Sequence, residues 1–365
     1  MRTLHVGRPN LGSEELFLAL VDEIFTSRQL TNDGPLVKLF EARLSRFLQV
    51  EHVVAVANAT LGLEILVHAL NMTKDVIVPS FTFIATPNAV SWCGGRPVFA
   101  DAAPGSFVVD PYHVEDLITS RTSGIIGVHT FGQPCDVKAL GNIAERYNVP
   151  LIFDAAHALG CTHNGQRLGG SGDAEVFSFH ATKVINSFEG GAITTNDPNL
   201  ATTCRQMRNF GITGYGQTAN LGINAKMSEV HAAMGIVSLE KYDEIVRHNQ
   251  AVWRMYRQGL DDVDGVYLIP HHPDEQTNYH YVVLEVKEGR DTLWEYLHAH
   301  DILARRYFHP GCHRLVPYAL SNPDLSLPRT EVLCDHLLCL PTGQDVTARD
   351  VERVCEVIKE GLCSV

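Results

Sequence analysis

Short apolar segments alternate with longer amphipathic segments along most of the chain. Each apolar segment has the length of a β-strand, and each amphipathic segment repeats its apolar residues with the period of an α-helix. The expected strands are Val53–Ala57, Val76–Val78, Val98–Ala100, Ile125–Val128, Leu151–Phe153, Val176–Phe179 and Ala192–Thr195. The expected helices include Ser13–Phe25, a segment with Val37, Phe40, Leu44 and Phe47 on one face, Thr60–Leu70, Ala85–Cys93 and Val137–Tyr147. This alternation predicts an α/β fold, with a mostly parallel seven-stranded sheet between helices.

Local signals mark the start of two helices and the direction of the last strand. Ser13, followed by Glu14 and Glu15, is typical of a helix start, and Thr31–Pro35 is a strong turn signal before the second helix. The pair Gly190-Gly191 precedes the last strand, which indicates a hairpin-like return and one antiparallel strand.

A second, smaller unit is expected at the C-terminal end. A helical stretch from about Ser228 to Leu260 leads out of the first unit. A strand at Val282–Val286, a helix around Asp291–His300 and a final helix at Thr347–Leu362 then predict an α+β arrangement. We place the boundary inside the long helix, which gives a large domain of residues 1–245 and a small domain of residues 246–365.

Composition agrees with a compact protein of two domains and argues against two classes of partner. The 365 residues are 45% hydrophobic, which is enough for a large core. The net charge of −13 repels nucleic acid and anionic lipid. No run of about 18 apolar residues occurs, and the N-terminus lacks a basic region followed by an apolar one. We therefore expect a cytoplasmic protein without nucleic-acid or membrane partners.

Neither the cysteines nor the histidines suggest a metal site. The nine cysteines are an odd number without a CxxC pair, so buried thiols are the expected explanation. The histidines at positions 298, 300, 309 and 313 fit no ligand spacing.

Candidate chemistry lies directly after the predicted strands, where ligands bind in open α/β sheets. In the segment Leu151–His157, Asp154 ends a strand, and His157 follows about one helical turn later. A carboxylate in this position could pair with a protonated ring nitrogen. The alternative is that Asp154 caps a helix.

Two further strand ends carry polar groups. After Val176–Phe179 the chain continues through His180, Ala181 and Thr182 to Lys183, a lysine that could reach into a cleft or be an ordinary solvated charge. After Val53–Ala57 the segment Asn58–Gly62 opens a helix, whose free N–H groups could hold a phosphate. Ordinary capping by Asn58 or Thr60 would explain this turn equally well.

Together the strand-end lysine, the strand-end aspartate and the helix start match the needs of a pyridoxal 5'-phosphate (PLP) site. Lysine forms an imine with PLP, the aspartate keeps the pyridinium nitrogen protonated, and the helix start binds the phosphate. A nicotinamide-dependent enzyme would instead need GxGxxG after the first strand, and none follows Val53–Ala57.

Six blocks of the sequence resemble the DegT/StrS-type sugar-nucleotide aminotransferases, a branch of the fold type I PLP enzymes. They are Leu30–Pro35, Val78–Thr86, Asp154–His157, Ser178–Lys183, Phe188–Gly191 and Leu221–Glu229. The chain departs from many members at Phe188 and Lys226, where glycine and arginine are common. A dehydratase branch has histidine in place of the lysine, so Lys183 favours transamination.

The resemblance implies a role for each candidate cofactor residue. Lys183 would carry PLP as an internal Schiff base, Asp154 would pair with the pyridinium, and His157 would bond near the ring hydroxyl or Asp154. The remaining contacts would be Phe83 stacked on the ring, the phosphate held by Ala59, Thr60 and Ser178, and Asn224 reaching over from a neighbouring subunit. A homodimer with shared active sites is part of this expectation. Separately, Phe83 could be a core residue, Ser178 a strand hydroxyl and Asn224 a turn residue.

The resemblance also implies the reaction. L-Glutamate would donate its amino group, pyridoxamine 5'-phosphate would form, and the amine would pass to C4 of dTDP-4-keto-6-deoxyglucose in deoxyaminosugar biosynthesis. Lys226, Arg305, Tyr307 and His309 are the candidate substrate contacts, and a solvated edge is the alternative for the Arg305–Pro310 segment. A 3-ketosugar aminotransferase, an aminocyclitol enzyme and a non-catalytic regulator are the alternative functions; intact Lys183 and Asp154 argue against the last.

Overall fold

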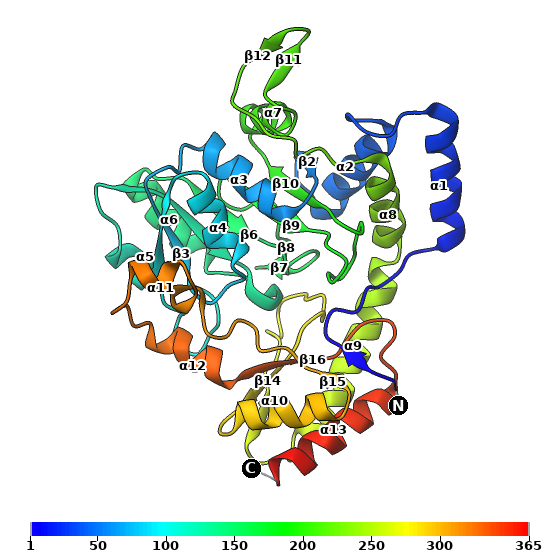
Figure 1. Ribbon diagram of the computed structural model, residues 1–365, viewed down its shortest axis with the longest axis vertical. Coiled ribbons are helices and arrows are strands. Elements are labelled where there is room, and N and C mark those ends of the chain that lie inside the picture. Colours follow the sequence, from blue (N-terminus) through cyan, green and yellow to red (C-terminus); the bar gives the residue numbers. More distant parts are fainter. Residues whose placement is uncertain (1, 364–365) are drawn as a thin grey trace.

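A seven-stranded sheet forms the centre of the larger part of the molecule (Figure 1). The structure is a computed structural model and describes residues 2–363. In spatial order the strands are β2 (His52–Val56), β10 (Gly191–Thr195), β9 (Ala174–Ser178), β6 (Leu151–Asp154), β5 (Thr122–Val128), β3 (Asp75–Pro79) and β4 (Arg96–Ala100). Neighbouring strands are parallel except at β10, which is antiparallel to both β2 and β9. The predicted fold class is confirmed, including the antiparallel strand after Gly190-Gly191.

Helices cover both faces of this sheet because its strands are apolar on both sides. Val53 and Ala55 of β2 pack into one core, whereas Val54 and Val56 pack into the core on the opposite face. The helices on the first face are α1 (Glu14–Ser27), α2 (Pro35–Leu48), α5 (Pro111–Asp116), α6 (Val137–Tyr147) and α8 (Glu229–Glu240). Those on the second face are α3 (Ala59–Ala69), α4 (Ala85–Trp92) and α7 (Pro198–Met207).

The long helical stretch expected from Ser228 to Leu260 is two helices, so that prediction is wrong in one respect. Helix α8 ends at Glu240, and α9 (Tyr242–Leu260) begins after Lys241, whose φ of −91° and ψ of 0° interrupt the helix. Apolar periodicity continues across this break, which explains why the sequence reads as one helix. The domain boundary placed at residue 245 falls in the first turn of α9 and stays a prediction.

The C-terminal unit is built around a smaller antiparallel sheet. The sheet has the order β13 (Val266–Leu268), β14 (Val282–Val286) and β16 (Leu337–Leu340). Helices α9, α10 (Arg290–Ala299) and α13 (Ala348–Leu362) pack on it around one core. The N-terminal strand β1 (Leu4–His5) also lies here and pairs in parallel with β15 (Ile302–Leu303) (Figure 1). The expected α+β character of this region agrees with the structure, although β13 and β16 had no clear sequence signal.

The remaining elements are short. They are the hairpins β7 (Thr162–His163) with β8 (Gln166–Arg167) and β11 (Ile212–Gly214) with β12 (Gln217–Thr218), the 3-10 turns η1 (Thr130–Gly132) and η2 (Cys312–Arg314), and helices α11 (Tyr318–Ser321) and α12 (Pro328–His336). All nine cysteines are free thiols, and seven of them are buried. Within residues 2–363, no helix combines the length and the apolar character needed to cross a membrane.

Candidate active site

A cavity of about 590 Å³ lies between the ends of the central strands and the C-terminal unit. Its floor comes from the residues that follow β2, β3, β6 and β9, and its far wall comes from Tyr281, Tyr307 and Phe308. The cavity also includes Lys183, Asp154, His157, Ala59, Thr60, Phe83 and Ser178. Seven of the eight expected cofactor contacts therefore line one space, at the edge of the sheet where ligands are expected.

Asp154 is the last residue of β6, and its carboxylate is fixed on both oxygens. Oδ2 accepts a hydrogen bond from Thr86 Oγ1 at 2.8 Å, and Oδ1 accepts one from the Ala156 N–H at 3.1 Å. Turns rather than a helix follow β6, so the helix-cap alternative for Asp154 is wrong. Burial raises the pKa of Asp154, while the two hydrogen bonds and the nearby Lys183 and His129 oppose that rise. A cation bound against the carboxylate would complete its ionisation.

Lys183 lies in the loop after β9, and its amine is held inside the cavity rather than in bulk water. The Nζ atom donates to Tyr281 Oη at 3.5 Å. Burial lowers the pKa of Lys183 to about 8, although the Asp154 carboxylate pulls in the opposite direction. Above about pH 8 the amine is therefore mostly neutral, and only a neutral amine can attack a carbonyl or accept a proton.

His157 also lines the cavity, in a turn after β6. Its Nδ1 accepts a hydrogen bond from the Phe131 N–H at 3.2 Å, so the ring proton lies on Nε2. Burial, followed by the charge of Lys183, lowers the pKa of His157 well below its usual range. The imidazole is therefore a neutral donor facing the cavity, and within residues 2–363 it bonds the Phe131 amide and not Asp154.

The start of α3 forms an anion cradle at the other end of the cavity. Asn58 caps the helix by accepting from the Leu61 N–H at 2.9 Å, which leaves the N–H groups of Ala59 and Thr60 without an intrahelical acceptor. Gly191 of β10 approaches so closely that a Cβ there would lie 2.7 Å from the Ala59 nitrogen. Capping and phosphate binding are thus compatible, because they use different N–H groups.

Ser178 and Phe83 add a hydroxyl and an aromatic face. Ser178 Oγ accepts from the His180 N–H at 3.3 Å, so its own O–H can be donated to a ligand. Phe83 is 58% exposed although it lies in the cavity wall, which is unusual for a phenylalanine and leaves its ring available for stacking. A buried carboxylate, an amine of lowered pKa, an aromatic face and an anion cradle in one cavity fit PLP.

The expected substrate contacts are only partly brought to this cavity. Tyr307 lines it. Arg305 is exposed and pairs through its backbone with Cys339, and His309 lies beside Arg290 and Asp335. Lys226 donates to Asn224 Oδ1 at 2.7 Å and lies over the Phe210 ring, outside the cavity of its own chain.

Several lining residues were missed by the sequence reasoning. Tyr281 and Phe308 come from the C-terminal unit. Glu189 and His180 also line the cavity, with His180 Nε2 3.4 Å from Glu189 Oε1. Thr86 lies in the block Val78–Thr86, but the sequence did not indicate that it would donate a hydrogen bond to Asp154. An aromatic residue next to a predicted strand, as Tyr281 is, was the only available signal.

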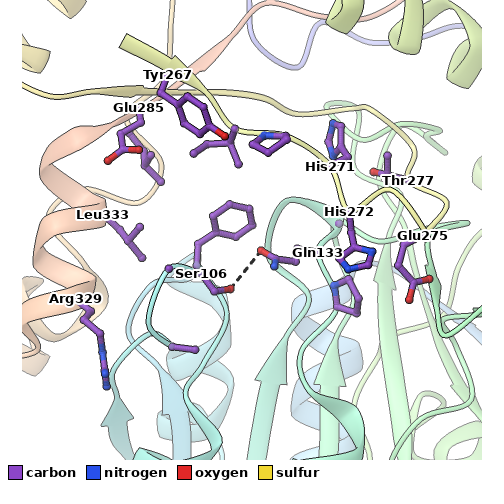
Figure 2. Close-up of a pocket in the computed structure, with 18 of the residues that line it drawn as sticks. Ser106, Gln133, Tyr267, His271, His272, Glu275, Thr277, Glu285, Arg329 and Leu333 are labelled. Carbon is purple, nitrogen blue, oxygen red and sulfur yellow. Dashed lines mark hydrogen bonds between the residues drawn. The ribbon is translucent and has the colours of Figure 1, made fainter. Parts of the chain in front are cut away.

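A larger cavity of about 670 Å³ lies elsewhere between the two units (Figure 2). Ser106 and Gln133 line one side, and Tyr267 and Glu285 line the other. Neither a lysine nor an aspartate is among its lining residues. Arg329 at its edge already pairs with Asp110 at 2.8 Å. This larger space therefore lacks the groups needed for PLP chemistry.

Comparisons with known proteins agree with the geometry of the smaller cavity. The model of the DegT/DnrJ/EryC1/StrS aminotransferase family matches residues 12–359. The chain is 34% identical to a dTDP-4-amino-4,6-dideoxy-D-glucose transaminase of Shigella dysenteriae, over 98% of this chain and 99% of that one. It is 33% identical to the GDP-perosamine synthase of Caulobacter vibrioides, over 98% of each chain. Among solved structures, DesI in the presence of its TDP-sugar product superposes with a TM-score of 0.95 and 43% identity, over 100% of this chain and 93% of that one.

Proposed function

Because the chain belongs to the DegT/DnrJ/EryC1/StrS aminotransferase family, we propose that it aminates C4 of dTDP-4-keto-6-deoxyglucose, with L-glutamate as amino donor. At the coarser level the chain is a PLP-dependent aminotransferase that acts on nucleotide sugars. The observation that carries the finer proposal is full-length similarity to enzymes whose names or products specify a dTDP- or TDP-linked sugar.

We assign the cofactor contacts by the chemistry of the cavity. Lys183 would attach PLP, Asp154 would pair with the pyridinium, and His157 would donate to the ring hydroxyl. Phe83 would stack on the ring, and Ala59, Thr60 and Ser178 would hold the phosphate. When bound, PLP withdraws electrons from the carbon that gains or loses the amino group.

The chain's own contribution to the reaction is centred on Lys183. Once free, the amine would move one proton from the donor α-carbon to the cofactor carbon that bears the amino group. In the second half of the cycle it would move one proton from that carbon to C4 of the sugar. A pKa near 8 suits proton transfer in both directions, because the neutral and the protonated forms of the amine are both accessible near neutral pH. Asp154 supplies a negative charge near the amine, and its hydrogen bonds from Thr86 and Ala156 prevent it from rotating away.

The cavity of a single chain lacks cations for its anionic substrates. Among the described residues that line it, Lys183 is the only lysine or arginine. Glutamate brings two carboxylates and the sugar nucleotide brings a diphosphate, so further positive or amide groups are required. Asn224 is exposed on its own chain and forms a β-bridge with Asn209, shortly before the β11–β12 hairpin. That hairpin projects from the body of the molecule (Figure 1). We assign the missing contacts to Asn224 and Lys226 of the partner subunit in a homodimer.

The substrate proposal predicts a defined product. Incubation of the holoenzyme with dTDP-4-keto-6-deoxyglucose and ¹⁵N-labelled glutamate should place ¹⁵N on C4, as read by NMR of the purified sugar nucleotide. A GDP-linked 4-keto-6-deoxyhexose should react with a kcat/KM lower by roughly tenfold or more, because the nucleotide pocket discriminates by lost contacts. Label on C3, or preference for the GDP sugar, would replace this substrate with one of the alternatives.

The shared site predicts complementation between two inactive variants. Lys183→Ala and Asn224→Ala chains should each lose most activity, whereas refolding an equal mixture should restore roughly a quarter of the wild-type activity, because each mixed dimer contains one intact site. A mixture of Lys183→Ala with Asp154→Ala is the matched control and should stay inactive, since both residues lie in the same chain's cavity. Activity no higher than that of the separate variants would place Asn224 outside the partner's site.

A further inference from the structure

We infer that His280 and Tyr281, two consecutive residues of the C-terminal unit, position the lysine loop: Tyr281 holds the Lys183 amine and His280 holds the backbone just before it. This inference rests on the proposed role of Lys183 as the PLP lysine. Neither residue was a candidate from the sequence, and both come from a segment almost a hundred residues further along the chain.

Tyr281 contacts the reacting atom of the site directly. Its hydroxyl accepts from Lys183 Nζ at 3.5 Å, and its ring lies 4.5 Å from the His157 ring and 5.3 Å from the Phe131 ring. Burial raises the pKa of Tyr281 well above its usual range, so the hydroxyl stays protonated and cannot act as a base. A neutral amine has two N–H bonds and one lone pair. Anchoring one N–H on Tyr281 therefore restricts the directions in which the lone pair can point.

His280 fixes the same loop through its backbone. Its Nε2 donates to the Thr182 carbonyl at 2.7 Å, and Thr182 immediately precedes Lys183. Burial lowers the pKa of His280 to about 4, so the ring is neutral and adds no repulsive charge beside the amine. Its buried Nδ1 has no hydrogen-bond partner within residues 2–363, which agrees with a ring that carries its single proton on Nε2.

The two contacts act together because the His280 and Tyr281 rings lie side by side, with centroids 4.9 Å apart, and face two consecutive residues of the loop, Thr182 and Lys183. His280 and Tyr281 directly precede β14, the middle strand of the C-terminal sheet. One side chain reaches the loop backbone and the next reaches the amine. The position of the C-terminal unit therefore fixes the position of Lys183, which makes this unit part of the catalytic apparatus and more than a lid over the cavity.

Tyr281→Phe tests the inference with the ring retained and only the hydroxyl removed. We expect kcat to fall roughly tenfold, with the KM of either substrate changed less than about twofold, because the loss affects the proton transfer and not binding. Tyr279→Phe is the matched control. It removes a hydroxyl from the same segment, one that accepts from Gln250 and is remote from the lysine, and it should keep wild-type kcat.

A second readout uses the protein without cofactor. The pH at which half of the Lys183 amine reacts with an acylating reagent, followed by peptide mass spectrometry, should fall in Tyr281→Phe, because the protonated amine loses an acceptor. Asp154, His157 and His280 also face the amine and are unchanged in this variant. Wild-type kcat together with an unchanged midpoint would overturn the role of Tyr281.

His280 is tested by a pair of substitutions. Glutamine can place an N–H near the position of the histidine Nε2, whereas leucine cannot donate. His280→Gln should therefore keep most of the kcat that His280→Leu loses, and equal losses in both variants would overturn the role of His280. Borohydride reduction of the wild-type holoenzyme distinguishes a failure of the proposed function from a failure of the positioning role of His280 and Tyr281. PLP found on Lys183, together with unaffected variants, removes this inference alone, whereas PLP found elsewhere removes the proposed function and this inference with it.

Discussion

Replacing Lys183 by alanine is expected to lower amination by about 10⁴-fold and to remove the absorbance of lysine-bound PLP at about 410–430 nm. The cavity explains the size of this loss. Lys183 is the only amine among the described residues that line it, so no neighbouring side chain can take over either attachment or proton transfer.

The amine is also prepared for its task by its surroundings. Its pKa of about 8 results from burial, which outweighs the opposing pull of the Asp154 carboxylate, and such tuning is absent from an ordinary surface lysine. Lys241→Ala is the matched control, because this lysine is partly exposed, lies away from the cavity and pairs with Glu244 at 2.7 Å. It should keep wild-type absorbance and rate.

The experiment measures single-turnover rates and the absorbance spectrum of each purified variant, with circular dichroism to compare folding. Addition of a small primary amine to Lys183→Ala should recover part of the activity, because the space left by the side chain can admit it. A folded Lys183→Ala protein that retains the absorbance and aminates the sugar at a wild-type rate would contradict the assignment of the lysine.

The central sheet could be predicted from the sequence because its signal is local. Each strand is a short apolar run, and the direction of β10 follows from the glycine pair Gly190-Gly191 at its start. The same holds for residues that follow a strand: Asp154 and Lys183 reach one cavity because β6 and β9 are parallel neighbours. At these positions the place of a residue just after its strand is enough to predict where its side chain lies.

The features that could not be predicted from the sequence depend mainly on contacts between distant segments. Tyr281 meets Lys183 across 98 positions, and nothing within either segment indicates that the two will touch. Arg305 belongs to a recognised region but is held at the surface by its pairing with Cys339. The break at Lys241 is a matter of one residue's backbone angles within a continuous apolar pattern. The first two features depend on how the C-terminal unit sits on the sheet.

Asp154→Asn is expected to lower kcat by about 10²–10³-fold while leaving the fold intact. The substitution preserves the shape of the side chain, and the asparagine oxygen can still accept from Thr86 or from the Ala156 N–H. It removes the negative charge that would favour a protonated pyridine nitrogen, so the electron withdrawal that PLP supplies becomes weaker. The effect should appear in single-turnover rates with glutamate more than in the KM for either substrate, because the lost interaction strengthens as charge develops.

Asp173→Asn is the matched control for the loss of a negative charge at Asp154. Asp173 lies near the opposite end of β6, where its carboxylate accepts from the Leu151 N–H at 2.8 Å, so the same chemical change is made at the same strand but away from the cavity. It should alter stability slightly and leave kcat unchanged. If Asp154→Asn retained the wild-type rate, the carboxylate would be structural, and the pairing with a ring nitrogen that links this site to PLP would have to be abandoned. A slow Asp154→Asn enzyme that still carries PLP on Lys183 would instead show that attachment and electron withdrawal depend on separate residues at the ends of two adjacent strands.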